Sequence, residues 1–105
     1  AVIINRTLRS GQRVKYQGNV VIVGDINPGA EVIAGKNIIV FGRLRGVVHA
    51  GASGSRDSQV AAIKLNPTQL RIASLIARSP DDDNDSDLQA ERAYIKDDQI
   101  VVEKI

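Results

Sequence analysis

The sequence predicts an all-β domain: a short β-helix of triangular section, made of about four coils of roughly 18 residues and closed by C-terminal strands. The first observation is an apolar residue at every sixth position of the first fifty residues. These nine ladder positions are Val2, Leu8, Val14, Val20, Ile26, Val32, Ile38, Leu44 and Ala50. Neither a helical face, with period 3.6, nor a single strand, with period 2, produces this spacing. Short strands that bend once every six residues do produce it.

A second period, of eighteen residues, lies on top of the first. Leu8–Gly11 aligns with Ile26–Gly29 eighteen residues later, and Leu44–Gly46 follows after another eighteen. Eighteen is three sixes, so each coil is predicted to contain three short strands and three corners before it stacks on the next coil. Equivalent residues of adjacent coils then lie about 4.8 Å apart, as in any sheet. An ordinary β-sandwich with coincidental spacing is the alternative interpretation.

The whole chain is interpreted as one domain, in which residues 1–78 form the coils. The register breaks between Gly51 and Ser58, where small residues replace the ladder. The pattern resumes at Val60–Ile63, which resembles Ile38–Phe41. The fourth coil is therefore predicted to be displaced by an insertion of three or four residues.

The last part of the coils carries signals for both helix and strand. Asn66-Pro67 followed by Gln69 is a helix-start signal, whereas the position in the coil favours a strand over Leu70–Ala73. Residues 79–91 are interpreted as an acidic loop. Its run of carboxylates lacks the glycine and the closing glutamate of an EF-hand loop, so it is interpreted as a solubilising segment rather than a calcium site.

Residues 92–105 are predicted to form two closing strands. Their apolar centres are Ala93–Ile95 and Ile100–Val102, and Asp97-Asp98 supplies the turn between them. A β-helix needs its open end covered, because unpaired edge strands are prone to aggregation. The two strands are therefore expected to act as a cap.

The charge is distributed unevenly along the chain. Residues 1–80 contain eleven Lys and Arg against three Asp and Glu, a net charge of +8, whereas residues 81–105 have a net charge of −6. A basic body attracts nucleic acid, anionic lipid or an acidic protein, unless the acidic segment folds near it and compensates it. The basic residues are not interleaved with aromatic ones, which argues against nucleic acid as a partner.

Cysteine and membrane signals are absent from the sequence. With no cysteine, a disulfide framework and a thiolate metal site are excluded, and a reducing compartment is compatible. No apolar run is long enough to span a membrane, and no segment has the pattern of a signal peptide. The chain begins directly in a strand-like run, as a fragment of a longer protein would.

One predicted face carries apolar residues that point outward as well as inward. If the ladder side chains point into the core, the outward set is Ile3, Val21, Val23, Ile39, Phe41, Ala61 and Ile63. A strand that is apolar on both sides is normally covered on both sides. We expect this face to form a two-fold homodimer interface. The alternative is that residues 79–105 fold over it.

Exposed corners on a rigid scaffold are the best candidate binding site in this sequence. The eighteen-residue period stacks three bends at one edge of the predicted prism. The bends present Arg9, Asn27 and Arg45 in a column, beside Ser10, Gly11, Gln12 and Gly29. Polar residues that merely occupy corners would show the same spacing.

Catalytic chemistry has little support in the sequence. His49 is the only histidine, and Ser53 lies in Gly-Ala-Ser-Gly, which is not a nucleophile elbow. No glycine pattern forms a phosphate-binding loop. We therefore expect a protein that is not an enzyme, with no catalytic residue, no metal site and no cofactor.

Four short motifs occur in a specific order and spacing: Arg9–Gln12, Gly29–Ala34, Gly42–Gly46 and Ala50–Gly54. Together they resemble the C-terminal domain of the septum-site-determining protein MinC, a cell-division inhibitor. The resemblance runs from about Leu8 to Ala73. It implies a right-handed β-helix that dimerises through one face, in agreement with the outward apolar set.

The resemblance also implies partners and a location. The family domain binds the ATPase MinD in its ATP-bound form and assists contact with the division protein FtsZ. The family's MinD-binding motif, Arg-Ser-Gly-Gln, is matched here by Arg9, Ser10, Gly11 and Gln12. The implied function is that of a cytoplasmic adaptor, recruited to the inner face of the membrane by its partner, which helps to block FtsZ-ring assembly away from midcell. The family's N-terminal domain, the main inhibitor of FtsZ assembly, is not in this sequence.

A fragment of a hexapeptide-repeat acyltransferase is the alternative function. Those enzymes also show apolar residues at every sixth position. They need more coils and a catalytic histidine, usually at a trimer interface, whereas here only His49 is available and the register breaks after three coils. The sequence therefore favours the adaptor over the enzyme.

Overall fold

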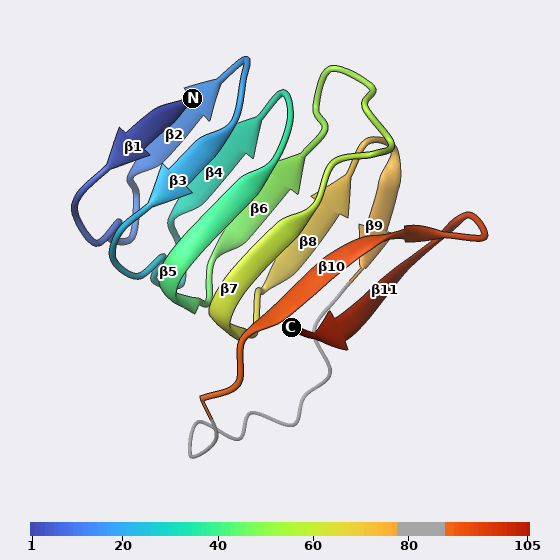
Figure 1. The fold of residues 1–105 in the computed structure, drawn as a ribbon. Coiled ribbons are helices and arrows are strands. Elements are labelled where there is room, and N and C mark those ends of the chain that lie inside the picture. Colours follow the sequence, from blue (N-terminus) through green and yellow to red (C-terminus); the bar gives the residue numbers. More distant parts are fainter. Residues whose placement is uncertain (78–87) are drawn as a thin grey trace.

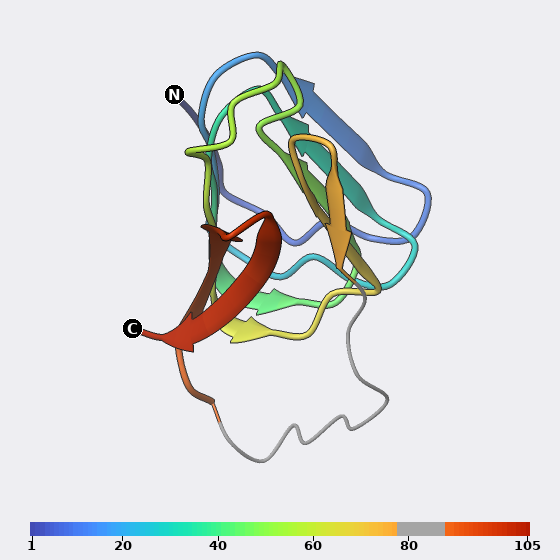
Figure 2. The same cartoon turned by 90° about the vertical axis from the view of Figure 1, so that its right-hand side faces the viewer.

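The computed structural model describes residues 1–77 and 88–105 of the chain. Within these ranges it contains eleven β-strands and no helix, arranged in two sheets that face each other across the core (Figures 1 and 2). As far as Ile72 the chain passes alternately from one sheet to the other, so each coil adds one strand to each sheet. The predicted all-β coil architecture is confirmed. No helix long and apolar enough to cross a membrane is found in the described residues.

Each sheet follows the order of its strands along the chain. The first sheet contains β1 (Val2–Ile4), β3 (Val20–Ile22), β5 (Ile38–Leu44), β7 (Val60–Leu65), β10 (Glu91–Lys96) and β11 (Gln99–Lys104). The second contains β2 (Arg13–Tyr16), β4 (Glu31–Ala34), β6 (Val47–Ala50), β8 (Gln69–Ile72) and β9 (Leu75–Ala77). The first four strands of each sheet are parallel, whereas β10, β11 and β9 pair antiparallel with their neighbours.

The ladder forms the core of the β-helix. Seven of its nine side chains have no exposed surface, and these are Leu8, Val20, Ile26, Val32, Ile38, Leu44 and Ala50. Val2 and Val14 are only partly buried, because no other coil of the described chain packs against the outer side of the first coil. Burial of one aliphatic side chain of this size stabilises a fold by about 1.5–3 kcal/mol. A continuous stack of such residues is therefore the main support of the domain.

The third side of the prism differs from the prediction of three strands per coil. It contains only isolated bridges, from Leu8 to Ile26 and from Ile26 to Leu44, in place of a continuous sheet. The chain turns immediately after Leu8 and again immediately after Ile26. The Gln12 N–H donates to the Arg9 carbonyl oxygen, and the Ala30 N–H donates to the Asn27 carbonyl oxygen. Residues held in such turns do not extend a strand, so each coil has two strands and one side made of corners.

The spacing between coils varies more than the period of eighteen predicts. Val20 pairs with Ile38 eighteen residues on, but Val32 pairs with Val48 only sixteen residues on, because the third corner lacks a turn. Ile38 then pairs with Val60, twenty-two residues on, so the predicted displacement is confirmed as four residues in the first sheet. The loop at 51–58 supplies these four residues and the two lost at the corner. The shifts at Val48 and at Val60 are even, so the inward side chains still point inward there. Further along β5, an irregularity between Val40 and Arg43 shifts the register by one residue, so Leu44 pairs with Leu65.

The end of the coils confirms a strand and adds an unexpected reversal. β8 covers the strand predicted over Leu70–Ala73 except for its last residue. Ala73 has a φ of 53° and lies in a turn that returns the chain as β9, antiparallel to β8. Ile76 therefore lies on a returning strand, opposite Arg71, and not on a continuation of the coil.

The closing strands form the β10–β11 hairpin, which begins at Glu91. Asp97 and Asp98 form its two-residue turn with φ values of 53° and 62°, the positive values that a tight hairpin requires. β10 pairs with β7, and its Ala93 is fully buried in the core. The hairpin therefore covers the edge of the last coil in the first sheet, as predicted. The predicted acidic loop lies mostly at residues 78–87, outside the described ranges.

Candidate functional site

The corner that follows Leu8 is a compact turn. The Gln12 backbone N–H donates to the Arg9 carbonyl oxygen at 2.9 Å. In return, the Gln12 side-chain Oε1 accepts a hydrogen bond from the Arg9 backbone N–H at 2.8 Å. The Gln12 side-chain oxygen is thus used to close the turn, and Arg9 and Ser10 are the exposed polar residues beside it.

The corners of successive coils are stacked by backbone hydrogen bonds. The Asn27 N–H donates to the Leu8 carbonyl oxygen at 2.9 Å, and the Arg45 N–H donates to the Ile26 carbonyl oxygen at 2.8 Å. Arg9, Asn27 and Arg45 therefore occupy equivalent positions in three coils. The structure therefore places the three residues of the predicted column in adjacent coils. The hydrogen bonds between the coils fix the position of each residue's backbone relative to the next.

Two glycines of this corner have different physical roles. Gly11 and Gly29 both have positive φ, 87° and 89°, which a residue with a side chain rarely adopts. A Cβ at Gly29 would lie 2.4 Å from the Ser10 Oγ, whereas a Cβ at Gly11 would have no atom within 4 Å. Gly29 therefore allows the two turns to pack, and Gly11 leaves open space at the surface where another molecule can approach.

The corner is cationic. Arg9 is exposed, Arg45 is half-buried, and Arg43 is half-buried on the other side of Leu44. The Nε atoms of Arg43 and Arg45 are buried without a hydrogen-bond partner in the described part of the chain. Arg43 was not among the predicted site residues, although it directly precedes a ladder residue in the same motif as Arg45. Guanidinium groups in this arrangement suit an acidic protein surface, because arginine forms bidentate bonds with carboxylates.

The outward apolar residues lie together on the first sheet. Ile3, Val21, Ile39 and Ala61 are neighbours in register across four strands. The exposed fractions of the larger members are Ile3 62%, Val23 42%, Ile39 39%, Phe41 57% and Ile63 38%. We call this surface, together with the half-buried Val21 and Ala61, the outer face. Residues 88–105 do not fold over it, because β10 and β11 extend the same sheet sideways (Figure 1).

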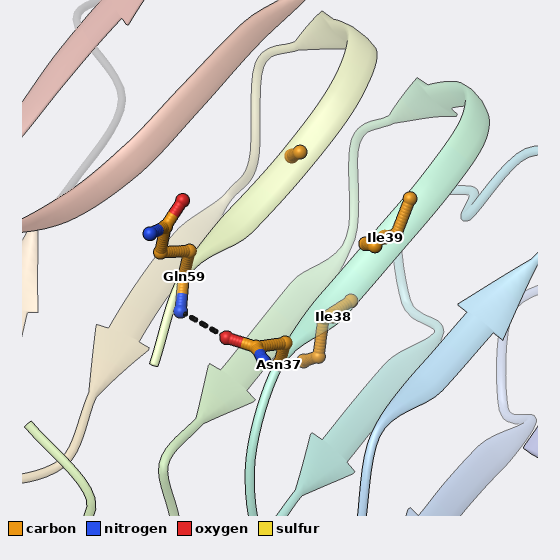
Figure 3. Close-up of a pocket in the computed structure, with 5 residues that line it drawn as sticks. Asn37, Ile38, Ile39 and Gln59 are labelled. Carbon is orange, nitrogen blue, oxygen red and sulfur yellow. Dashed lines mark hydrogen bonds between the residues drawn. The ribbon is translucent and has the colours of Figure 1, made fainter. Parts of the chain in front are cut away.

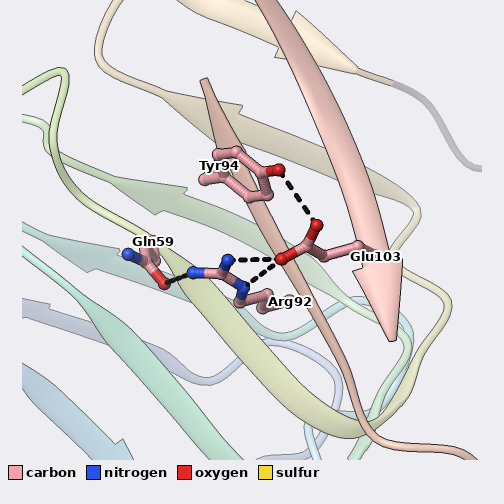
Figure 4. Close-up of polar contacts among 4 residues, drawn as sticks. All are labelled: Gln59, Arg92, Tyr94 and Glu103. Atoms are coloured by element: carbon pink, nitrogen blue, oxygen red, sulfur yellow. Dashed lines mark hydrogen bonds and ion pairs between the residues drawn. The ribbon is translucent and has the colours of Figure 1, made fainter. Parts of the chain in front are cut away.

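A polar cluster borders the outer face on the hairpin (Figure 4). The Arg92 Nε donates to the Glu103 Oε1 at 2.8 Å, and the Arg92 Nη1 donates to the Gln59 Oε1 at 3.1 Å. The Tyr94 hydroxyl donates to the Glu103 Oε2 at 3.0 Å, and the Arg92 guanidinium lies 4.6 Å above the Tyr94 ring. The cluster leaves no pattern in the sequence, since its members become neighbours only when the hairpin forms and pairs with β7.

The same contacts displace two pKa values. The hydrogen bond from Arg92 holds the pKa of Glu103 below its ordinary value. The hydrogen bond to Glu103 raises the pKa of Tyr94. The carboxylate therefore stays ionised, and the phenol stays protonated, over a wider pH range than in a free side chain. These polar groups mark the limit of the apolar surface on that side.

The second sheet carries a hollow of another kind. It has a volume of about 420 Å³ and is lined by Lys15, Tyr16, Gln17, Ile33, Gly35, Ala52 and Ser53. The Ser53 Oγ donates to the Gly35 carbonyl oxygen at 3.0 Å, and the His49 Nε2 lies 2.9 Å from the Ala73 carbonyl oxygen. Each of these two side chains contacts a backbone carbonyl and not the other side chain. The two do not form a nucleophile and its base.

Comparison with known proteins agrees with this geometry. Residues 2–105 match the family described as septum formation inhibitor MinC, C-terminal domain. The chain is 57% identical over 103 residues to a probable septum site-determining protein MinC of Persephonella marina, covering 98% of this chain and 51% of the relative. It is 55% identical over 103 residues to a protein of the same description from Heliobacterium modesticaldum, covering 98% of this chain and 36% of the relative.

A solved structure shows the same fold. The chain superimposes with a TM-score of 0.92 and 42% identity on a chain of the MinC:MinD cell division protein complex of Aquifex aeolicus, covering 99% of this chain and 85% of that chain. This chain spans about half or less of the length of the curated relatives described above. The match covers both sheets, the stacked corner and the hairpin. The chain therefore belongs to the family of MinC C-terminal domains.

Proposed function

We propose that this chain is a non-enzymatic dimerisation and adaptor domain of a division-site regulator. A MinD-type ATPase in its ATP-bound form recruits it from the cytoplasm to the inner face of the membrane. There it helps to block FtsZ-ring assembly away from midcell. The observation that carries this proposal is the stacked corner, which places Arg9, Ser10 and Gly11 on a rigid, open turn.

The corner has the chemistry of a protein-docking site. The Arg9 guanidinium offers paired donors, the Ser10 hydroxyl is both a donor and an acceptor, and Gly11 leaves space for close approach. Asn27 and Arg45 extend the same column by two coils. The matched Aquifex aeolicus structure is described as a complex of MinC with MinD, which supports a MinD-type ATPase as the partner of this corner.

The outer face supports a homodimer. A sheet surface without charged residues, which the hairpin leaves uncovered, is suited to a second copy of the same surface. A two-fold dimer would carry two equivalent corners, so one dimer would engage two ATPase subunits. Such bivalent attachment retains a protein at a membrane better than a single contact does. FtsZ as the downstream target follows from the family resemblance.

Membership of the MinC family supports the adaptor over the acyltransferase alternative. The family is described by septum formation and not by a reaction. Binding of acyl-coenzyme A separates the two functions directly. Tight binding would favour the enzyme, and its absence alongside ATPase binding would favour the adaptor.

The recruiting corner is tested by co-sedimentation with a MinD-type ATPase and lipid vesicles, with ATP and with ADP. We expect Arg9→Ala or Gly11→Asp to abolish ATP-dependent co-sedimentation while circular dichroism and light scattering stay unchanged. Loss of a buried interfacial charge contact costs about 2–5 kcal/mol, enough to lose a micromolar complex. Arg71→Ala, at an exposed arginine on β8, is the matched control. Normal recruitment of both corner variants would exclude the corner as the binding site.

A further inference from the structure

We propose that the hollow on the second sheet binds a small aromatic acid in its carboxylate form. The carboxylate pairs with Lys15, and the ring lies against Tyr16 and Ile33. The site uses neither the stacked corner nor the outer face, so it goes beyond the proposed function. The shape of the hollow, its charge and the hydrogen bonds of its walls all indicate this class of ligand.

The hollow lies where the chain leaves the second sheet, at the ends of β2, β4 and β6. It forms because Gly35, Ala52 and Ser53 are small and stand beside longer side chains of the first coil. A Cβ at Gly35 would lie 2.0 Å from the Gln17 carbonyl oxygen, so no larger residue fits there. The volume of about 420 Å³ is within the usual range of small-molecule sites.

The other hollow, of about 250 Å³, lies on the outer face between β5 and β7 (Figure 3). There the Asn37 Oδ1 accepts from the Gln59 backbone N–H at 2.8 Å (Figure 3), and the Gln59 Oε1 accepts from the Arg92 Nη1 at 3.1 Å. Its polar groups are therefore engaged, and the proposed homodimer would cover it. The second sheet faces the opposite way, because the two sheets enclose the core (Figure 2), so its hollow stays open in such a dimer.

Lys15 makes the hollow cationic. It alternates with the inward Val14 along β2 and is in register with Ile33 on β4, so both outward side chains meet at the hollow. Within the described residues, the Lys15 ammonium has no ion pair or hydrogen bond. Glu31 is already paired with Arg13 at 3.0 Å, and none of the described residues that line the hollow is acidic. An anionic ligand group is therefore needed to pair with this lysine.

The donors of the hollow suit a carboxylate better than a phosphate. Phosphate sites combine several free backbone N–H groups or several cations. Here the Gly35 N–H donates to the Tyr16 carbonyl oxygen, and the Ala52 N–H donates to the Ala34 carbonyl oxygen, both at 2.9 Å. Lys15 is the one charged residue of the described lining, and it matches the single charge of a carboxylate.

The remaining walls suit an aromatic body that carries a hydrogen-bond donor. Tyr16 is 41% exposed, and a Cβ at Gly18 would lie 3.1 Å from its Cε2, so the ring packs on this glycine and stays accessible. A ligand ring can stack on it beside the half-buried Ile33. The Ser53 Oγ donates to the Gly35 carbonyl oxygen at 3.0 Å, which leaves its lone pairs to accept a hydrogen bond from the ligand.

The stacking of the coils limits the length of the ligand. Lys15 lies on β2 and Ser53 follows β6, so two inter-strand steps, about 10 Å, separate their backbones. The two side chains occupy part of this distance, and an acid with one or two rings spans the rest. Indole-3-acetate has a carboxylate, a flat ring and an N–H donor, and it serves as the probe.

The test is a titration of ¹⁵N-labelled protein with indole-3-acetate, followed by amide chemical shifts. We expect saturable shifts at Gly35, Ala52 and Ser53. Indole-3-acetamide keeps the ring but loses the charge, and it should bind about tenfold more weakly or worse. Lys15→Ala should weaken the acid by the same factor and leave the amide unchanged. Lys36→Ala, at an exposed lysine that does not line the hollow, is the matched control.

A methylated ligand tests the contact with Ser53. 1-Methylindole-3-acetate lacks the N–H donor, so it should bind wild type more weakly than indole-3-acetate does. In Ser53→Ala the two acids should bind equally, an outcome that a purely structural role of the serine would not produce. Shifts confined to Ile39 and Ala61 would place the ligand on the outer face and overturn the site.

Two further results would also overturn the proposal. One is the absence of saturable shifts at the three amides of the hollow up to about 10 mM ligand. The other is equal affinity for indole-3-acetate and indole-3-acetamide. N-acetyl-glycyl-glycyl-tryptophan carries the same ring and carboxylate at the end of a peptide. Tighter binding of this tripeptide than of indole-3-acetate would overturn a free acid as the ligand in favour of a peptide C-terminus, and weaker binding would support the free acid.

Discussion

Ser10 and Gly29 show how closely single residues of adjacent coils depend on each other. The positive φ of Gly29 and its contact with Ser10 are two separate requirements for glycine, whereas Gly11 has only the first. A comparison of Gly11 with Gly29 therefore separates backbone strain from side-chain crowding. The two glycines lie in the same stacked corner and have almost the same φ.

Substitution by alanine should distinguish the two glycines. We expect Gly11→Ala to cost about 1–2 kcal/mol of unfolding free energy, from the left-handed conformation alone. Gly29→Ala should cost about 1–3 kcal/mol more, because its Cβ would also displace Ser10. Urea denaturation of the two variants measures the difference. Equal losses would show that Ser10 moves aside freely.

Ile26 tests the ladder at the residue scale. It has no exposed surface and bridges Leu8 on one side and Leu44 on the other. Ile26→Asp would bury an unpaired carboxylate, a cost of several kcal/mol, against a total stability of about 5–15 kcal/mol for a small domain. We expect an unfolded protein by circular dichroism, whereas Gln17→Asp, at an exposed position, should melt like wild type. An Ile26→Asp protein with a normal melting temperature would contradict the buried position.

The ladder and the corner column were predictable from the sequence for a physical reason. A buried stack demands apolar residues at every inward position, and a repeated corner repeats its polar residues, so both leave a period in the sequence. The roles of Gln12 and Arg43 leave no such trace. Which atom of Gln12 closes the turn depends on the local backbone path, and the environment of Arg43 depends on how adjacent coils pack.

At the scale of elements, the strands of the first three coils were easier to predict than the connections between them. A strand is specified by alternation along the chain, but the third side and the third corner depend on the length of each turn. β9 was missed for the same reason. Leu75–Ala77 is apolar whether it continues the coil or returns beside β8, and the turn at Ala73 decides between the two.

The β10–β11 hairpin should respond to acid through Glu103. The pKa of Glu103 is lower in the fold than its ordinary value because of Arg92. The contribution of this carboxylate to stability is therefore complete above its unfolded pKa and is lost as the pH falls through the lower, folded pKa. We expect Glu103→Gln to lower the melting temperature at neutral pH, and the difference from wild type to shrink toward zero in acid.

Two comparisons make this pH dependence specific. Glu91→Gln removes another carboxylate of the same hairpin, outside the Arg92 cluster that Figure 4 shows. We expect it to leave the difference between neutral and acid melting temperatures close to that of wild type. Thermal melts over a pH series measure all three proteins. A Glu103→Gln protein that keeps a constant deficit at every pH would contradict a role for the charge.

For the whole molecule, the two sheets have different surroundings. The second sheet has a mixed polar surface with the Arg13–Glu31 ion pair, at 3.0 Å, whereas the outer face of the first sheet is apolar. The two sheets share one core, so a change on the outer face need not disturb the fold. Oligomeric state and folding are therefore separable by mutation.

Ile39→Asp combined with Phe41→Asp should give a folded monomer. The two substitutions would place four carboxylates across a two-fold interface while the ladder stays intact. Light scattering measures the mass, and circular dichroism measures the β-sheet signal, which we expect to stay unchanged. Ile76→Asp on the second sheet is the control for added charge. A double variant that remains dimeric would place the interface elsewhere, and one that unfolds would show that the face is internal.

The stacking of parallel coils also determines the order in which the molecule folds. Every pairing among β1 to β8 joins residues sixteen or more apart in the sequence, whereas β8–β9 and β10–β11 close across short turns. Contacts between near neighbours in sequence form fastest, because little chain entropy is lost. The two C-terminal hairpins are therefore expected to nucleate folding, with coils added toward the N-terminus. Because these hairpins follow the coils in the sequence, the coils should fold only after both hairpins have left the ribosome.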